Sequence, residues 1–217
     1  MKNQDAPLRS HKDWQYVQPW LSCSTLRAHL NESGTDGSRS SKTTDVLNRD
    51  TIWLFKKHLP KNDGWSFKTE YRIPCSRGDT FTVDVAIFKN NILKAVVLLK
   101  AIEKSYNKNR HNYANTLEGE VGRVKYSPTH TGVSVITVDW IPREVPAGDK
   151  FEKTKVPNQD CAEKYWNERL DDSSFVSFNK IRFDAKPIGL SHDSRGISNI
   201  EGVEKLYNSI VRLRQIG

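Results

Sequence analysis

The chain has 217 residues, of which 36% are hydrophobic and 28% are charged. This length supports one sizeable hydrophobic core rather than two, so we expect a single domain over residues 1–217. No apolar run approaches the roughly 20 residues that a membrane helix needs, and the N-terminus lacks the apolar segment of a secretory signal. These features favour a cytoplasmic protein without membrane contacts.

The formal net charge is +8, from 34 Lys and Arg against 26 Asp and Glu. A basic surface favours a polyanionic partner, because neutralising phosphates releases counterions. The three cysteines (Cys23, Cys75 and Cys161) are far apart and form no C-x-x-C pair. We therefore expect reduced thiols and no structural zinc site.

Two segments precede the main pattern of strands. Residues 31–45 are rich in Ser, Gly and Thr and are predicted to form a flexible loop. The apolar residues in 45–59 predict a helix that ends before Pro60.

The pattern then changes to period two, which indicates strands at 67–73 and 80–88. A nearly continuous apolar strand is predicted at 93–102, joined to the preceding strand through a turn at Asn90 and Asn91. The alternation places four apolar residues on one face of the second strand: Phe81, Val83, Val85 and Ile87.

A helix with a narrow apolar stripe is predicted at 103–125, followed by a central strand at 133–140 that is apolar on both faces. A further helix and strand are expected at 160–170 and 175–183. The chain closes with an amphipathic helix for which Ser198 and Glu201 suggest a capping box. These elements predict an α/β fold with a mostly antiparallel or mixed sheet flanked by helices.

Two charged residues interrupt the apolar strands. Asp84 lies in the middle of the strand VDVAIF, and Lys100 lies near the end of the next strand, VVLLKAI. A charge in an apolar strand is costly unless something compensates it. A solvated strand end for Lys100 or a surface salt bridge for Asp84 would be sufficient explanations.

The alternative is chemistry. Metal-assisted phosphodiester hydrolysis needs carboxylates that hold Mg²⁺ and a lysine near the attacking water. Because side chains two residues apart share one strand face, Leu98 and Lys100 point the same way, and we expect that face to be turned toward Asp84.

The run from Asp84 through thirteen residues to L-L-K-A resembles the motif of the PD-(D/E)xK, restriction-endonuclease-like superfamily. The stretch at 103–123, which is rich in Asn and contains G-E-x-x-R, is similar to the segment that follows this motif in some type II restriction enzymes. The resemblance covers about residues 45–140. It implies a restriction-endonuclease-like core, Mg²⁺ as cofactor, Asp84 and the backbone carbonyl of Leu99 as metal ligands, and Lys100 as the residue that orients water.

Two positions depart from that pattern. Val83 replaces the usual proline, which is a mild change, but Leu98 occupies the position of the second catalytic carboxylate. A leucine neither binds a metal nor accepts a proton, so Leu98 marks a vacated ligand position. The chain is then an inactivated variant, a scaffold kept for binding, or an enzyme that draws an acid from elsewhere. The candidate acids are Glu70, Glu103, Glu118 and Glu120, and Glu70 is expected to be a third catalytic residue.

Polar and basic residues crowd the segment after the motif. Lys and Arg suit phosphates, while Asn and Arg read base edges in the major groove. Gly119 and Gly122 would allow close helix packing between the subunits of a homodimer, which would match a two-fold symmetric DNA site. A solvated helix face is the alternative. The predicted DNA-binding residues are Lys104, Ser105, Asn107, Lys108, Asn109, Arg110, Asn112, Asn115 and Arg123, with Lys125 as an extension.

Together these features predict a Mg²⁺-dependent endonuclease of the type II restriction class that hydrolyses double-stranded DNA, either active or impaired by Leu98. The competing hypothesis is a non-catalytic DNA-binding protein on the same fold. A third is an unrelated basic α/β domain that binds protein or RNA.

Overall fold

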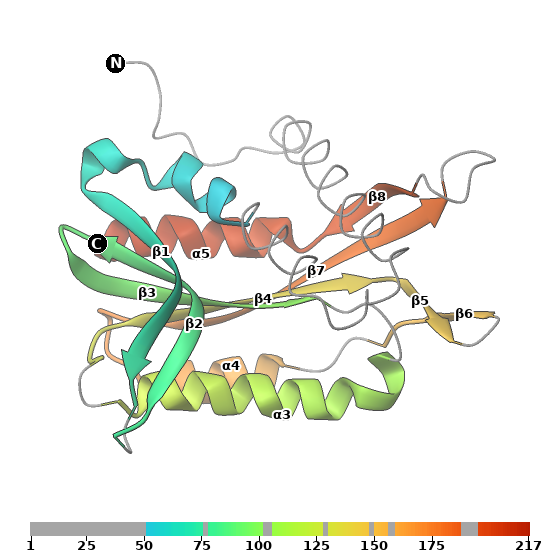
Figure 1. Cartoon of the computed structure of the whole chain (residues 1–217), viewed down its shortest axis with the longest axis horizontal. Coiled ribbons are helices and arrows are strands. Elements are labelled where there is room, and N and C mark those ends of the chain that lie inside the picture. The colour runs from blue at the N-terminus through green and yellow to red at the C-terminus, as the bar shows by residue number, and fades with distance from the viewer. Residues whose placement is uncertain are drawn as a thin grey trace.

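The computed structural model describes residues 51–75, 78–101, 106–127, 130–147, 150–155, 159–187 and 195–217. Its centre is a six-stranded mixed sheet in the order β1-β2-β3-β4-β7-β8. Helices α3 and α4 cover one face of this sheet, while α5 and the helical residues 51–58 cover the other (Figure 1). The predicted α/β class with a mixed sheet flanked by helices is confirmed.

The N-terminal half of the sheet is a meander of three antiparallel strands, β1 (Trp65–Pro74), β2 (Thr80–Lys89) and β3 (Ile92–Ala101). A 3₁₀ turn, η2 (Lys61–Asp63), precedes β1. The β2–β3 turn has positive φ at both Asn90 and Asn91, 49° and 65°. Asparagine tolerates this left-handed conformation, which two-residue hairpin turns require. The predicted hairpin is confirmed.

The second half of the sheet contains parallel strands. Helix α3 (Tyr106–Lys125) carries the chain from β3 to β4 (Ser134–Pro142), and these two strands pair in parallel. Strand β7 (Val176–Pro187) pairs in parallel with the other edge of β4. Every residue of β4 is buried, as predicted for a central strand covered on both faces.

Between β4 and β7 the chain forms a small hairpin and a short helix. The hairpin consists of β5 (Glu144–Ala147) and β6 (Lys150–Lys153), and it extends beyond the carboxyl ends of the parallel strands (Figure 1). Helix α4 (Asp160–Asn167) follows. The sequence pattern predicted α4 but not the β5–β6 hairpin.

The chain ends with β8 (Arg195–Glu201), antiparallel to β7, and helix α5 (Val203–Ile216). The predicted capping box is wrong, because Ser198 and Glu201 belong to β8 and the N-cap of α5 is Gly202. Gly202 has a φ of 91°, and a Cβ there would lie 2.0 Å from the carbonyl oxygen of Lys180. Only glycine fits this close approach.

Two hydrophobic cores lie on the two faces of the sheet. Val85 and Ile87 of β2 pack in the core under α5, whereas Val83 packs in the core under α3. The prediction that the apolar residues of β2 share one face is therefore wrong. The alternation breaks at Asp84. The pairing between β2 and β3 ends one residue away, at the pair of Val85 and Val97. On the other side of β2, Glu70 of β1 has a positive φ of 44°.

The helical residues 51–58 end before Pro60, as the sequence predicts. No helix in the described part of the chain is long and apolar enough to cross a membrane. The predicted loop at 31–45, and the residues Glu103, Lys104 and Ser105, lie outside the described residues.

Candidate functional site

Asp84 lies where the pairing between β2 and β3 ends. Its Oδ2 accepts a hydrogen bond from the backbone N–H of Leu99 at 2.7 Å. Burial raises the pKa of this carboxyl above its ordinary value, a shift opposed by the Leu99 hydrogen bond and by the charge of Lys100, and reinforced by Glu120. Asp84 is therefore a partly buried carboxylate among charged neighbours and not a surface salt bridge.

Leu98 and Lys100 lie on the α3 side of β3, as the two-residue spacing predicts. Leu98 is 1% exposed and packs in the core that also contains Leu117 and Val121 of α3. Glu120, next to Val121 on α3, accepts a hydrogen bond from Lys100, with Nζ and Oε1 2.8 Å apart. Leu98 is thus a core residue, while a carboxylate from the facing helix reaches the lysine.

A second buried acid, Asp139 of β4, lies beside this pair. Lys100, Asp139 and Lys180 are direct register partners across β3, β4 and β7, so their Cα atoms form one row. Asp139 is 5% exposed, and its Oδ2 accepts a hydrogen bond from the side-chain amide of Gln159 at 3.0 Å. Burial raises the pKa of Asp139 to about 6, although Gln159, Lys100 and Lys180 oppose the shift.

Asp139 and Lys180 are not among the site residues predicted from the sequence. The signal for Asp139 was present, because it is a lone charge in the apolar strand SVITVDWIP, as Asp84 is in its own strand. Lys180 gave no such signal, since the strand around it also contains other polar residues. Only the strand register brings it next to Asp139.

Two carboxylate oxygens in this cluster are buried without a hydrogen-bond partner among the described residues: Oε2 of Glu120 and Oδ1 of Asp139. Such orphaned oxygens call for a water, an ion or a functional role. Carboxylate oxygens are the ligands that Mg²⁺ prefers, and Mg²⁺ is commonly held by one or two carboxylates plus waters. The described residues contain no group of three or more His, Cys, Asp or Glu side chains that could hold a metal ion, so a Mg²⁺ ion here would have to retain several waters.

The row of charges starts at the carboxyl end of β3 with Lys100 and crosses β4 and β7 near the beginning of α4. In open α/β sheets, ligands bind outside the carboxyl ends of the strands. The location of these charges in the fold is therefore typical of a functional site. We call Asp84, Lys100, Glu120, Asp139 and Lys180 the charged cluster.

Three of the four candidate acids lie in the described residues, and the structure separates these three. Glu120 belongs to the charged cluster, whereas Glu118 is exposed on the outer side of α3. Glu70 lies between the residues that pair with Val83 and Val85, so it stands opposite Asp84 on β1, but its side chain is exposed. The structure gives Glu70 no place in the cluster.

The predicted DNA-binding residues on α3 differ in their exposure and in their hydrogen bonds. Asn107 fixes the start of the helix to the β5–β6 hairpin: its amide donates to the Lys153 carbonyl at 2.9 Å and to Glu152 at 3.4 Å, and its Oδ1 accepts from the Lys155 N–H at 2.8 Å. Asn107 is therefore committed to internal bonds. Lys108, Asn112 and Asn115 are exposed, and Asn109 and Arg110 are half-buried.

At the other end of α3, the guanidinium of Arg123 lies over the ring of Phe81, 5.4 Å from its centre. Lys125 donates to the carbonyl oxygen of Val133 and to the hydroxyl of Ser174. Burial lowers the pKa of Lys125 to about 8. Lys125 thus joins the helix to the sheet and does not extend an exposed basic patch.

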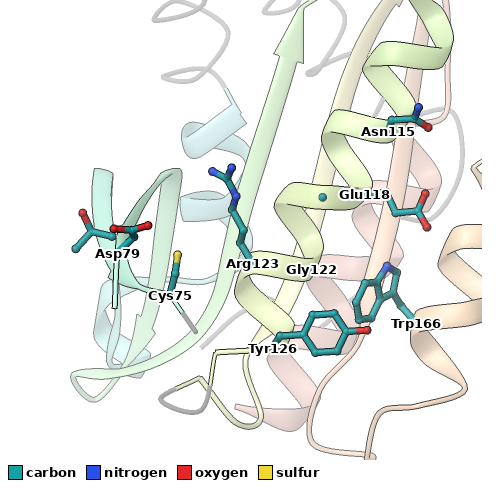
Figure 2. A pocket seen from close by; sticks show the side chains of 10 residues that line it. Cys75, Asp79, Asn115, Glu118, Gly122, Arg123, Tyr126 and Trp166 are labelled. Carbon is teal, nitrogen blue, oxygen red and sulfur yellow. The ribbon is translucent and has the colours of Figure 1, made fainter. Parts of the chain in front are cut away.

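A groove of about 890 Å³ runs along the outer side of α3 (Figure 2). The charged cluster is on the inner side of the same helix and does not line this groove. Gly119 and Gly122, which the sequence suggested for helix packing, lie in the groove, and nothing lies within 4 Å of a Cβ placed at Gly119. The lining residues are Cys75, Asp79, Thr80, Asn115, Glu118, Gly119, Gly122, Arg123, Tyr126 and Trp166.

No protein-family model matches the chain, and no curated protein sequence matches it. The chain is similar to one chain of a solved structure, which is described as the refined half-complex from a tetradecameric assembly of Thermococcus gammatolerans McrB AAA+ hexamers with bound McrC. The similarity covers 80% of the present chain and 33% of the other chain. The two chains are 13% identical and superpose with a TM-score of 0.37, which is too low to support an argument about fold or function.

Proposed function

We propose that the chain is a metal-dependent nuclease of the PD-(D/E)xK type that hydrolyses phosphodiester bonds of double-stranded DNA. The observation that carries the proposal is the contact of Glu120 with Lys100 at 2.8 Å. It lies on the α3 side of β3, where Leu98 occupies the position of the acid in the motif. In this proposal Glu120 replaces the missing carboxylate, and the chain is not an inactivated variant.

Asp84 and Glu120 are the proposed Mg²⁺ ligands. The backbone carbonyl of Leu99 is the third candidate, because the N–H and C=O of one strand residue point to the same edge and its N–H already points to Asp84. A bound Mg²⁺ would polarise the phosphate and lower the pKa of a bound water. Lys100, 29% exposed in its side chain, would hydrogen-bond the attacking water and offset the negative charge that develops on the phosphate.

The substrate assignment rests on the net charge of +8 and on the exposed basic and amide side chains of α3, such as Lys108 and Asn112. The restriction-type specificity and the homodimer rest on the sequence resemblance alone. Sedimentation of the protein with and without duplex DNA measures the oligomeric state that the dimer hypothesis needs.

A plasmid-nicking assay with Mg²⁺ or Mn²⁺ tests the proposal. We expect the wild-type chain to nick DNA only with the metal, and Asp84→Asn and Glu120→Gln each to lower the rate by about a hundredfold or more. Glu118→Gln, an exposed acid on the same helix, is the matched control and should keep the wild-type rate. Equal rates for Glu120→Gln and Glu118→Gln would remove Glu120 from the site.

The second candidate is a DNA-binding protein without nuclease activity. It is favoured by Leu98 and by the lack of a three-acid metal group among the described residues. This hypothesis predicts salt-sensitive binding of duplex DNA in Ca²⁺ and no nicking in Mg²⁺ or Mn²⁺. Absence of binding in Ca²⁺ would instead favour an unrelated basic domain.

A further inference from the structure

Asp139 carries a buried negative charge that the proposed reaction does not use. One of its oxygens is held by Gln159 at 3.0 Å, and the other, Oδ1, is buried without a partner among the described residues. A buried ionised carboxylate is costly unless it is compensated. The position of Asp139 in the sheet shows which lysines lie near enough to compensate its charge.

Lys100 and Lys180 flank Asp139 in the register of the sheet, yet each forms its ion pair with a different acid. Lys180 lies 3.4 Å from Asp160, whose side chain is 75% exposed. Lys100 lies 2.8 Å from Glu120. The charge of each lysine still lowers the pKa of Asp139, and Lys100 has the larger effect of the two.

The contact that places Glu120 at the proposed site also has a consequence for Lys100, because Glu120 has to give up this ion pair to bind a metal. A carboxylate that serves as a metal ligand loses much of its capacity to neutralise an ammonium group. Lys100, 29% exposed in its side chain, would then lose its ion-pair partner, which is unfavourable in a partly buried site. The lysine needs a second carboxylate within reach of its side chain.

We propose that Asp139 is this alternative partner of Lys100: when Glu120 turns to a divalent cation, the Lys100 ammonium moves to the free Oδ1 of Asp139. The inference rests on the proposed function. Neighbouring strands lie about 4.8 Å apart, and the two residues are paired on β3 and β4, so a rotation of the lysine side chain is sufficient. Gln159 binds only Oδ2 and leaves Oδ1 free for the ammonium. Asp139 is a positioning residue that keeps Lys100 in the site.

The test measures Mn²⁺ binding to the full chain by calorimetry, without DNA. Asp139→Asn retains an oxygen that accepts from Gln159 but removes the charge, so we expect Mn²⁺ to bind about tenfold more weakly, because Lys100 no longer releases Glu120 easily. Lys164→Met, which removes a lysine of α4 that lies outside the charged cluster and is 77% exposed in its side chain, is the matched control, and its Mn²⁺ affinity should stay within about twofold of the wild-type value. An unchanged affinity in Asp139→Asn, or an equal loss in both variants, overturns the inference.

A double-mutant cycle separates this role from a merely structural one. In a Lys100→Met background there is no ammonium to transfer, so adding Asp139→Asn should change Mn²⁺ affinity by less than about twofold. If Asp139→Asn weakens Mn²⁺ binding equally with and without Lys100, Asp139 acts only through the general field or the fold, and the inference is wrong. Thermal unfolding of each variant checks that the fold is retained.

The same titrations separate failure of the inference from failure of the proposed function. If the wild-type chain binds no Mn²⁺, or if Asp84→Asn binds it as well as the wild type does, the proposed metal site is wrong and the inference is overturned with it. If the wild type binds Mn²⁺ through Asp84 and Glu120 but Asp139→Asn is unaffected, only the transfer of Lys100 is rejected.

Discussion

The two faces of the central sheet differ in the kind of polar group that the described residues bury: hydroxyls and an amide on one face, carboxylates on the other. Under α5, Ser177 and Ser209 lie 2.7 Å apart between their hydroxyl oxygens, and Asn179 donates to the carbonyl oxygen of Thr137 at 2.9 Å. Under α3 and α4, Glu120 and Asp139 each retain a buried oxygen without a partner among the described residues. The first arrangement stabilises the fold, while the second is typical of sites where local consistency is sacrificed for function.

The largest expected effect comes from placing a charge in the apolar part of the α3 face. Leu98→Glu should lower the free energy of unfolding by more than about 3 kcal/mol, because Leu98 is 1% exposed and the new carboxylate would be buried among leucine and valine side chains. Urea unfolding measures the change, and Leu98→Met is the volume-conserving control. A wild-type midpoint for Leu98→Glu would show that this part of the face is open to water, as a ligand position would be.

An intermediate effect is expected on the opposite face. Asn179→Ala should cost about 2 kcal/mol of unfolding free energy, because it leaves the Thr137 carbonyl and the Ser177 hydroxyl without their shared partner. Its Mn²⁺ affinity should equal that of the wild type, since Asn179 lies on the α5 side of the sheet. A loss of Mn²⁺ binding without a loss of stability would contradict the division of roles between the faces.

The smallest effect is a pH dependence from Asp139. Its pKa is raised from 3.8 to about 6 in the folded chain, so the folded state binds more protons than the unfolded state between these values, and stability falls as pH rises through that window. Between about pH 5 and 7, the wild type should lose about 1 kcal/mol relative to Asp139→Asn. Urea unfolding of both proteins at the two pH values measures the difference, and parallel profiles would show that Asp139 does not titrate in this range.

Much of the fold followed from local patterns. The hairpin of β2 and β3 was predictable because Asn90 and Asn91 tolerate the left-handed turn and the flanking strands are strongly apolar. The central position of β4 was predictable because its pattern is apolar on both faces. The start of α5 was not, because Gly202 is required by a contact with Lys180, which is 22 residues earlier in the chain and has no local signature.

The site was predictable only in part. Asp84 and Lys100 were identified as charges in apolar strands, and Glu120 was one of four possible acids. Choosing among those acids required the position of α3 over the sheet, since Glu118 and Glu120 lie on opposite sides of the helix. Asn107 is predicted to bind DNA from its polar and basic neighbours. Its bonds to the β5–β6 hairpin could not be predicted, because they join segments about 45 residues apart.

The sequence by itself determined β1 to β4 and β7, the β2–β3 hairpin, and the pair of charges that interrupts the apolar pattern, because period-two alternation and turn chemistry act between near neighbours. The tertiary structure alone decided that Leu98 is a core residue, that Glu120 reaches Lys100, and that Asp139 lies between two lysines. The physical reason is that strand register and helix docking are set by the packing of the whole sheet, and the electrostatics of Asp84 and Lys100 depend on which distant charges that packing brings to them.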